Sequence, residues 1–349
     1  MATLRHVEIA NVRNHTNYAC DLSPHVTLIH GPNGAGKTSL LEAIYLSAQG
    51  VSFKSTDRDM ITEGQQWYRV DVRDDTGLVR KIVYDNRGER PVKSLTIDGK
   101  KHARMPAAAR LPIVIFEPDD LRLVHGSPTR RRQYLDRLLA QLDPRYGTQL
   151  RRYARALLQR NRLLKRAVTP DQIFPWDVIL SDTAAFIIDA RIRLTQQLDQ
   201  LLSDYYQQIA GDDVGVTIAY SRTAVTSHQL IEAYRQTFER DRLLGSTSVG
   251  PHRDDVRITY AGRPADRVVS RGENRTITLA LKYIEAHLLE QTYGQTPIIL
   301  LDDVFGELDE SRQRNLIHTF TRNQVVVTAT HSVDMLPVDT KTILLRHRS

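Results

Sequence analysis

The chain has 349 residues, of which 41% are hydrophobic, and its formal net charge is +7. This length allows two or three domains with ordinary soluble cores, and the single cysteine, Cys20, excludes an internal disulfide framework and indicates a reducing compartment. The chain has no apolar run long enough to span a bilayer and no secretory h-region, so we expect a cytoplasmic protein with no membrane partner. The basic balance is compatible with a polyanionic partner but not specific for one.

Short apolar runs separated by turn residues fill the chain up to about residue 118. Their composition predicts strands over 7–12, 26–29, 68–72, 79–84, 95–97 and 113–116. We therefore expect residues 1–118 to form the first part of an α/β domain built on a mixed sheet.

A phosphate-binding pattern follows the second predicted strand. The run Gly31-Pro32-Asn33-Gly34-Ala35-Gly36-Lys37-Thr38 fits G-x-x-x-x-G-K-[ST], in which glycines let backbone N–H groups surround the β- and γ-phosphates. Apolar residues repeat with helical period from residue 40 to 48, so strand, loop and helix occur in the required order. The pattern predicts binding of ATP or GTP, with Lys37 meeting the phosphate charge and Thr38 holding Mg²⁺.

Residues 119–245 have few strand patterns and long helical periodicity, which predicts an inserted, mainly helical arm. The stretch 130–166 holds twelve Arg or Lys residues and two Asp residues, a local balance near +10. Two interpretations remain open: a solvated basic face, or a groove for nucleic-acid phosphates. The scarcity of acidic neighbours and the preference for arginine over lysine favour phosphates.

Strand patterns return over 256–260, 298–301, 325–328 and 342–345, and we expect them to complete the first sheet, with 246–349 as the second part of the nucleotide domain. Asp302 and Asp303 directly follow the second of these runs. An apolar strand ending in carboxylates is where a P-loop protein completes its magnesium shell. The nucleotide domain is thus predicted to be split in sequence and joined in space.

A second anion site is predicted at Ser270-Arg271-Gly272-Glu273-Asn274-Arg275, which precedes a helix expected from about 276 to 291. ATP-binding-cassette (ABC) proteins carry their signature at this position, where a hydroxyl and the N–H groups of a helix N-terminus attract phosphate. If this site and the P-loop both face outward from one sheet, the signature cannot serve its own P-loop. Two heads would then sandwich ATP, and ATP would favour the homodimer.

Several further motifs together resemble the bacterial RecF recombination mediator family, nearly from end to end. They are F-E-P-D-D-L over 116–121, G-S-P-T-R-R-R over 126–132, G-P-H-R-D-D over 250–255 and L-D-D-V-F-G-E-L-D over 301–309. The resemblance implies an ABC-type ATPase head related to those of SMC and Rad50 proteins, ATP-dependent dimerisation, and binding of single-stranded and gapped duplex DNA. It also implies work with RecO and RecR in loading recombinase, in DNA repair, replication and the SOS response.

The resemblance assigns roles to individual residues. It implies that Asp302 helps hold Mg²⁺ and that Asp303 orients the attacking water. Arg13 and Asn14 match the family's N-terminal nucleotide contact, although a plain surface turn is the alternative. His331 stands where transporter-type cassettes have a switch histidine, with a satisfied strand-end histidine as its alternative. The remaining predicted contacts are Ser270, Gly272 and Arg275 to nucleotide and Arg130, Arg131, Arg132, Arg151 and Arg152 to DNA.

The chain departs from the family pattern at several positions. Arg271, Glu273 and Asn274 replace residues of the usual S-Q-G-Q-Q-R signature, and Gly306 replaces the serine of the S-x-L-D loop. Asp303 is one methylene shorter than the usual glutamate, so we expect a weak, DNA-stimulated ATPase that serves as a binding switch. The alternative function is an ABC-type ATPase subunit of a transport complex or of another DNA-maintenance complex. A Rad50-type head would need a far longer coiled coil than this insertion supplies.

Overall fold

The computed structural model describes residues 3–166, 169–222, 224–331, 333 and 336–346. They divide into two compact units, unit 1 with residues 1–121 and 285–349, and unit 2 with residues 122–284. Unit 2 therefore extends beyond the predicted arm of 119–245. The reason is that strand β10 (Asp255–Tyr260) pairs with β9 (Val216–Ser221), which lies inside the insertion.

The first sheet of unit 1 is antiparallel and has the strand order β2-β1-β4-β5-β6-β7. One face is buried, as the alternating burial of β4 and β5 shows. Its strands are β1 (Leu4–Val12), β2 (His15–Asp21), β4 (Trp67–Asp74), β5 (Val79–Asp85), β6 (Val92–Ile97) and β7 (Lys100–His102).

The second sheet of unit 1 has the order β14-β3-β13-β12-β8, and all its pairings are parallel. Its strands are β3 (Val26–His30), β8 (Ile113–Phe116), β12 (Ile298–Leu301), β13 (Val325–Ala329) and β14 (Lys341–Leu344). The head is thus joined from both ends of the chain, as predicted. Two details of the prediction were wrong: the strands form two sheets rather than one, and the strand predicted over 256–260 belongs to unit 2.

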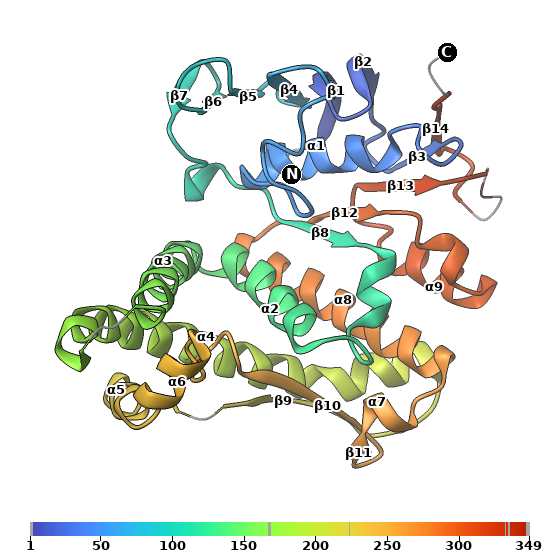
Figure 1. Cartoon of the computed structure of the whole chain (residues 1–349). Helices are drawn as coiled ribbons and strands as arrows, with labels where there is room; N and C mark the ends of the chain where they lie inside the picture. The colour runs from blue at the N-terminus through green and yellow to red at the C-terminus, as the bar shows by residue number, and fades with distance from the viewer. Residues whose placement is uncertain (1–2, 167–168, 223, 332, 334–335, 347–349) are drawn as a thin grey trace. The chain divides into compact units, whose positions relative to one another are not determined.

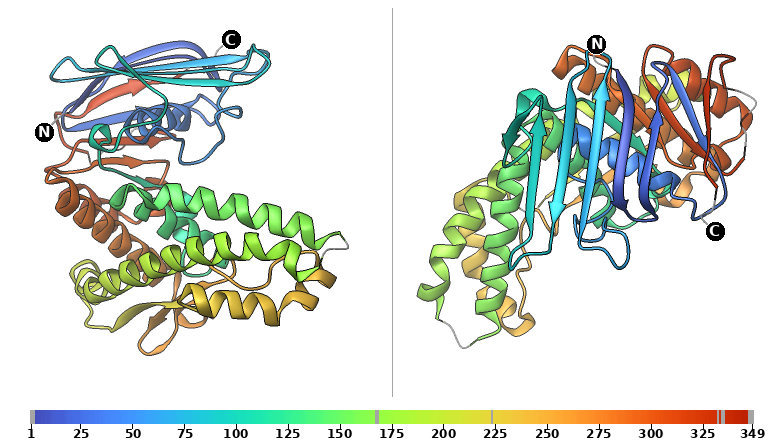
Figure 2. Two further views of the ribbon diagram at one scale, coloured as in Figure 1. Left: turned by 90° about the vertical axis from the view of Figure 1, so that its left-hand side faces the viewer. Right: turned by 90° about the horizontal axis from the view of Figure 1, so that it is seen from above.

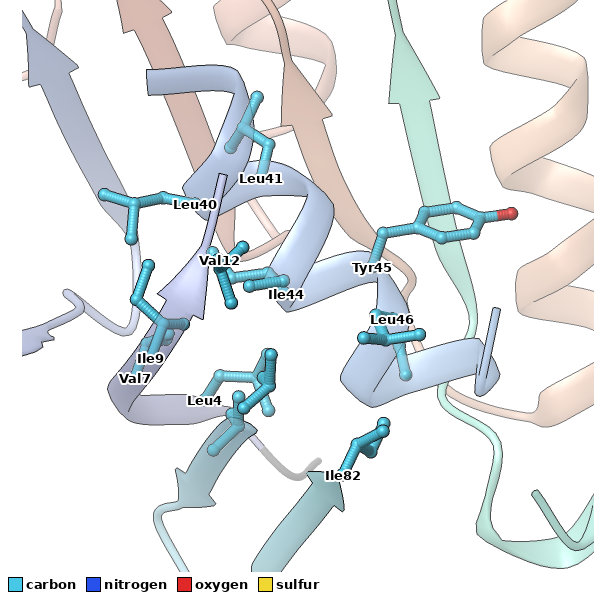
Figure 3. Packing of buried hydrophobic residues seen from close by; sticks show 14 of the residues in the cluster. Leu4, Val7, Ile9, Val12, Leu40, Leu41, Ile44, Tyr45, Leu46 and Ile82 are labelled. Atoms are coloured by element: carbon cyan, nitrogen blue, oxygen red, sulfur yellow. The ribbon is translucent and has the colours of Figure 1, made fainter. Parts of the chain in front are cut away.

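Helix α1 (Lys37–Gln49) packs against both sheets, contacting β1, β4 and β5 of the first and β13 of the second. In Figure 1 it lies beneath β1 and β4, and the view from above in Figure 2 shows strands of the antiparallel sheet crossing it. Almost every residue of α1 is buried, as expected for a helix covered on several sides. Figure 3 shows apolar side chains of β1 and α1 facing one another, among them Val7, Ile9, Leu40 and Ile44.

Unit 2 combines helices with a three-stranded antiparallel sheet of order β11-β10-β9. The long helix α4 packs against α3, α5 and β9. The elements are α2 (Pro128–Leu142), α3 (Tyr146–Leu164), α4 (Pro170–Ala210), α5 (Ser227–Gln236), α6 (Phe238–Leu244), β11 (Arg263–Pro264) and α7 (Ala265–Val268). Helix α8 (Arg271–Tyr293) continues into unit 1, which also contains α9 (Glu310–Thr319) and the short 3-10 helix Ala107–Ala109. Among the described residues, no helix is long and apolar enough to cross a membrane.

Candidate functional site

The loop between β3 and α1 turns so tightly that glycine is required at two positions. Gly36 has a φ of 91°, and a Cβ there would lie 2.1 Å from Nε2 of His15. The same ring nitrogen lies 3.1 Å from the Gly36 carbonyl oxygen. A Cβ on Gly31 would lie 2.2 Å from the carbonyl oxygen of Leu345. The loop therefore has the close backbone approach that a P-loop needs.

Lys37 begins α1 with its ammonium group turned back over the loop. Its Nζ donates to the carbonyl oxygens of Gly31 at 2.9 Å and Pro32 at 3.3 Å. It also lies 3.8 Å from Oδ2 of Asp303, and the side chain is buried. The predicted phosphate-binding lysine thus lies inside the loop and next to one of the two predicted carboxylates.

Thr38 and Asp302, predicted to share the magnesium ion, are in direct contact. The Thr38 hydroxyl lies 2.9 Å and 3.1 Å from the two carboxylate oxygens of Asp302. Thr328 on β13 donates to Asp302 at 3.0 Å and accepts the backbone N–H of Asp303 at 2.9 Å. Burial raises the pKa of Asp302, and the hydrogen bonds from Thr38 and Thr328 oppose that rise. A buried carboxylate beside a hydroxyl is a donor pair suited to a hard cation such as Mg²⁺.

Asp303 has features of a residue held in place for function. Its φ of 50° is in the left-handed region, which costs a non-glycine residue about 1–3 kcal/mol. Its Oδ1 is buried and has no hydrogen-bond partner among the described residues. Since a buried carboxylate oxygen is costly to leave unpaired, this atom fits a site that accepts a hydrogen bond from a ligand or water.

A pocket open to solvent gathers most of the predicted nucleotide contacts of unit 1. Asn14 donates to the Gly34 carbonyl at 2.7 Å, so it also supports the loop. Sequence reasoning missed two lining residues, Ser39 and Lys54, and the turn after α1 that carries Lys54 has no motif. The lining residues are Arg13, Asn14, Asn33, Gly34, Gly36, Lys37, Thr38, Ser39, Lys54 and Asp303.

His331 follows β13 at the same sheet edge that carries Asp302 and Asp303. Parallel pairing of β12 with β13 brings the carboxyl ends of both strands to that edge. The His331 side chain is exposed and does not line the pocket. Its role as a switch histidine stays a prediction.

The signature lies in unit 2, at the start of α8, whereas the P-loop lies in unit 1. Glu273 accepts the backbone N–H of Ser270 at 2.6 Å, and the Ser270 hydroxyl accepts the N–H of Glu273 at 3.3 Å. Tyr260 donates to the other carboxylate oxygen at 2.7 Å. These hydrogen bonds lower the pKa of Glu273. Glu273, a departure from the family signature, therefore forms a helix-capping pair with Ser270. Gly272 and Arg275 lie near the same end of α8.

The second departure, Gly306, lies in the 3-10 turn Phe305–Glu307. A Cβ added there would meet nothing within 4 Å, so the space for serine is present and only its hydroxyl is missing. Asp309 is the N-cap of α9, and its side chain accepts the N–H of Arg312 at 3.0 Å.

Part of the basic stretch 130–166 forms one face of α3. This helix contains no acidic residue, and its opposite side is buried through Tyr146, Tyr153 and Leu164. A helical wheel of 100° per residue places the cations together on the solvent side. The exposed cations of this face are Arg151, Arg152, Arg155 and Arg162, and the exposed Lys165 and Arg166 follow directly after the helix.

Other arginines of the stretch are used inside unit 2. Arg131 forms a bidentate ion pair with Asp255, with both N–O distances 2.9 Å, and donates to the Gly126 carbonyl at 2.7 Å. Arg132 donates to the Asp254 carbonyl at 2.7 Å. These contacts join two motifs far apart in sequence. They give Arg131 a structural role, and its DNA contact stays a prediction; Arg130 is half-buried, and Arg151 and Arg152 are exposed.

Arg160 is also removed from any DNA surface, because its side chain is fully buried. It pairs with Asp177 at 2.6 Å and with Asp241 at 2.7 Å, and stacks over the ring of Tyr234. The positive charge of the arm therefore divides into an exposed face on α3 and a buried network that holds helices together.

Comparison with known proteins gives matches along almost the whole chain. The family described as RecF/RecN/SMC N terminal domain matches residues 3–347. The DNA replication and repair protein RecF of Chloroflexus aggregans is 36% identical over 373 residues, covering 95% of this chain and 94% of the relative. That of Roseiflexus castenholzii is 34% identical and covers 94% of this chain and 93% of the relative.

Solved structures of the recombination mediator protein RecF in the RecFOR pathway are similar in fold. The RecF-ATPrS structure matches with a TM-score of 0.86 and 29% identity, over 96% of this chain and 94% of the other. The RecF-ATP structure matches with a TM-score of 0.83 and 28% identity, over 95% and 93%. The predicted α/β fold, an ABC-type ATPase head with an inserted helical arm, is confirmed.

Proposed function

The chain belongs to the RecF family of DNA replication and repair proteins, and we propose that it is an ATP-dependent DNA-binding protein of recombinational repair and replication restart. Two chains would close on ATP at single-strand gaps and junctions and help to load recombinase. The coverage of about the whole chain by RecF relatives favours this function over a transport ATPase subunit.

The observation that carries the proposal is the nucleotide site of unit 1. Lys37 lies within the P-loop, Thr38 contacts Asp302, and Asp303 has a buried oxygen without a partner among the described residues. We expect Thr38 and Asp302 to hold Mg²⁺, which would neutralise phosphate charge. Asp303 would orient the attacking water, so the chain would be a slow ATPase whose turnover acts as a switch.

The dimer follows from the need for a second phosphate contact. In our proposal, Ser270, Gly272 and Arg275 of one chain meet the ATP held by the P-loop of its partner. A ligand that contacts both chains favours their association, and hydrolysis removes that advantage. The acid-free, exposed face of α3 supports DNA binding, because exposed cations in a row release counterions from DNA phosphates. RecO and RecR are the proposed protein partners, and the cytoplasm the proposed location.

The test measures association and DNA binding together. Sedimentation and binding of a gapped duplex would be measured with ATP, with ADP and without nucleotide. We expect a dimer and tight DNA binding with ATP only, and loss of both in Lys37→Met. The matched control is Lys81→Met, a change of the same type at an exposed position of β5. A wild-type chain that stays monomeric and binds DNA equally in all three conditions contradicts the proposal.

A further inference from the structure

Glu42 is a fully buried carboxylate on α1, outside every motif that identified the family. Its Oε2 accepts Arg13 Nε at 2.8 Å, and its Oε1 accepts the Ser52 hydroxyl at 2.5 Å. Arg13 Nη2, at 3.4 Å, and the Ser55 hydroxyl also donate to Oε1. Burying a charge at this depth costs several kcal/mol unless it is well paired. The donors that pair it come from two separate segments of unit 1.

Both of these segments carry residues of the nucleotide pocket. Arg13 lies between β1 and β2 in a left-handed conformation with a φ of 48°, and Ser55 accepts a hydrogen bond from its Nη2. Lys54 lies between the two serines, and its backbone N–H donates to the Ser52 hydroxyl at 3.0 Å. Arg13 and Lys54 both line the pocket, so Glu42 holds one pocket cation by its side chain and the other by the backbone that carries it.

The turn that carries Lys54 is also fixed at its far end. Asp57 accepts the hydroxyl of Tyr68 at 2.6 Å and Nζ of Lys93 at 2.5 Å, which attaches the turn to the antiparallel sheet. Lys54 lines the same pocket as Lys37, Thr38 and Asp303, the residues of its magnesium end. The terminal phosphate of ATP belongs at that end, beside Lys37 and Thr38.

We propose that Glu42 is a positioning residue that sets the preference of this site for ATP over ADP, by holding Lys54 and Arg13 at the pocket. This inference rests on the proposed ATP binding. The additional negative charge of ATP, relative to ADP, lies at the end of the pocket where Lys54 acts. A displaced Lys54 therefore weakens the binding of ATP more than the binding of ADP. Removing the Glu42 charge weakens its hydrogen bonds to both hydroxyls and to the guanidinium at once.

The test compares Glu42→Gln with Gln49→Met. Gln49 is buried on the same helix and donates to the Leu111 carbonyl at 2.7 Å, so its variant loses a buried hydrogen bond to a residue outside the turn. Affinities for fluorescent ATP and ADP would be measured by anisotropy. We expect the ratio of ATP to ADP affinity to fall about tenfold in Glu42→Gln, the size of one charged hydrogen bond, and to stay unchanged in the control.

A second readout needs no nucleotide. Hydrogen exchange of the amides in 52–60 should become faster in Glu42→Gln and stay at the wild-type rate in Gln49→Met. Lys54→Met should lower the same affinity ratio, and the double variant should lower it by less than the two single effects combined, because the two changes share Lys54.

The outcomes separate this inference from the function on which it rests. A wild-type chain that binds neither nucleotide overturns the proposed function. A Glu42→Gln chain that loses ATP and ADP affinity equally shows a merely structural residue and overturns the inference. If that variant fails to fold, Ser52→Ala with Ser55→Ala removes the same hydrogen bonds from the turn side, and an unchanged ratio in that chain overturns the inference as well.

Discussion

Replacing three exposed arginines of α3 by glutamine should change how DNA binding depends on salt. Arg152, Arg155 and Arg162 lie on one face of the helix and form no ion pair among the described residues. A phosphate contact contributes about −0.9 to the slope of log K against log salt for duplex DNA and about −0.7 for single strands. If all three contact phosphate, the slope becomes less steep by about 2.7 on duplex and about 2.1 on single-stranded DNA.

The assay is fluorescence anisotropy with a labelled gapped duplex, across a series of salt concentrations and in the presence of ATP. The matched control removes the same charge from exposed arginines that already pair with carboxylates. These are Arg87, Arg314 and Arg322, which pair with Asp85, Glu310 and Glu290. Equal slopes for the two triple variants would refute the assignment of DNA binding to this face, because they would show that only total charge matters.

Three further predictions concern single residues. Asp303→Asn should lower DNA-stimulated phosphate release about 100-fold or more and leave the ATP-bound dimer in place, as followed by sedimentation. Arg160→Met leaves Asp177 and Asp241 buried without their partner and should lower the free energy of unfolding by about 3–5 kcal/mol, whereas Arg162→Met on the exposed face should change it little. Burial lowers the pKa of His252 to about 4. Between about pH 6.5 and pH 4, His252 is therefore protonated in the unfolded chain but neutral in the folded chain. Stability should therefore fall as pH drops from about 6.5 toward 4, by at most about 1.4 kcal/mol per pH unit, and urea unfolding of His252→Gln should show a shallower dependence.

The strands whose bounds could be predicted well are those that consist of a local run of apolar, buried residues. β3, β8, β12 and β13 are apolar and buried almost throughout, and each was expected within about a residue of its bounds. β2 was missed because it is a polar edge strand with the sequence HTNYACD, which buries little. β9 was missed although VTIAYS alternates between buried and exposed residues, because helical patterns surround it.

The sheet to which a strand belongs is a harder question than whether the strand exists. The run 256–260 was correctly expected to be a strand, but it was placed in the head. Its pairing with β9 depends on contacts within unit 2, and nothing in its own residues specifies that partner. The nucleotide site was more predictable, because each side chain follows a recognisable strand or loop. Lys54 and Glu42 could not be identified from the sequence, because their roles arise only when the turn after α1 folds back on that helix.

Glu273 belongs to two sequence patterns at once, the phosphate-binding signature and a helix-capping box. As a substitution in a phosphate-binding signature, a carboxylate suggests repulsion of the phosphate. The same four residues from Ser270 to Glu273 also fit S-x-x-E, the capping-box pattern, and the structure has both reciprocal hydrogen bonds of that box, with Tyr260 as a third partner. The carboxylate therefore satisfies the N-terminus of α8 from within. An incoming phosphate would have to compete with Glu273 for the Ser270 N–H, so the substitution acts on the readiness of the signature as well as on its charge.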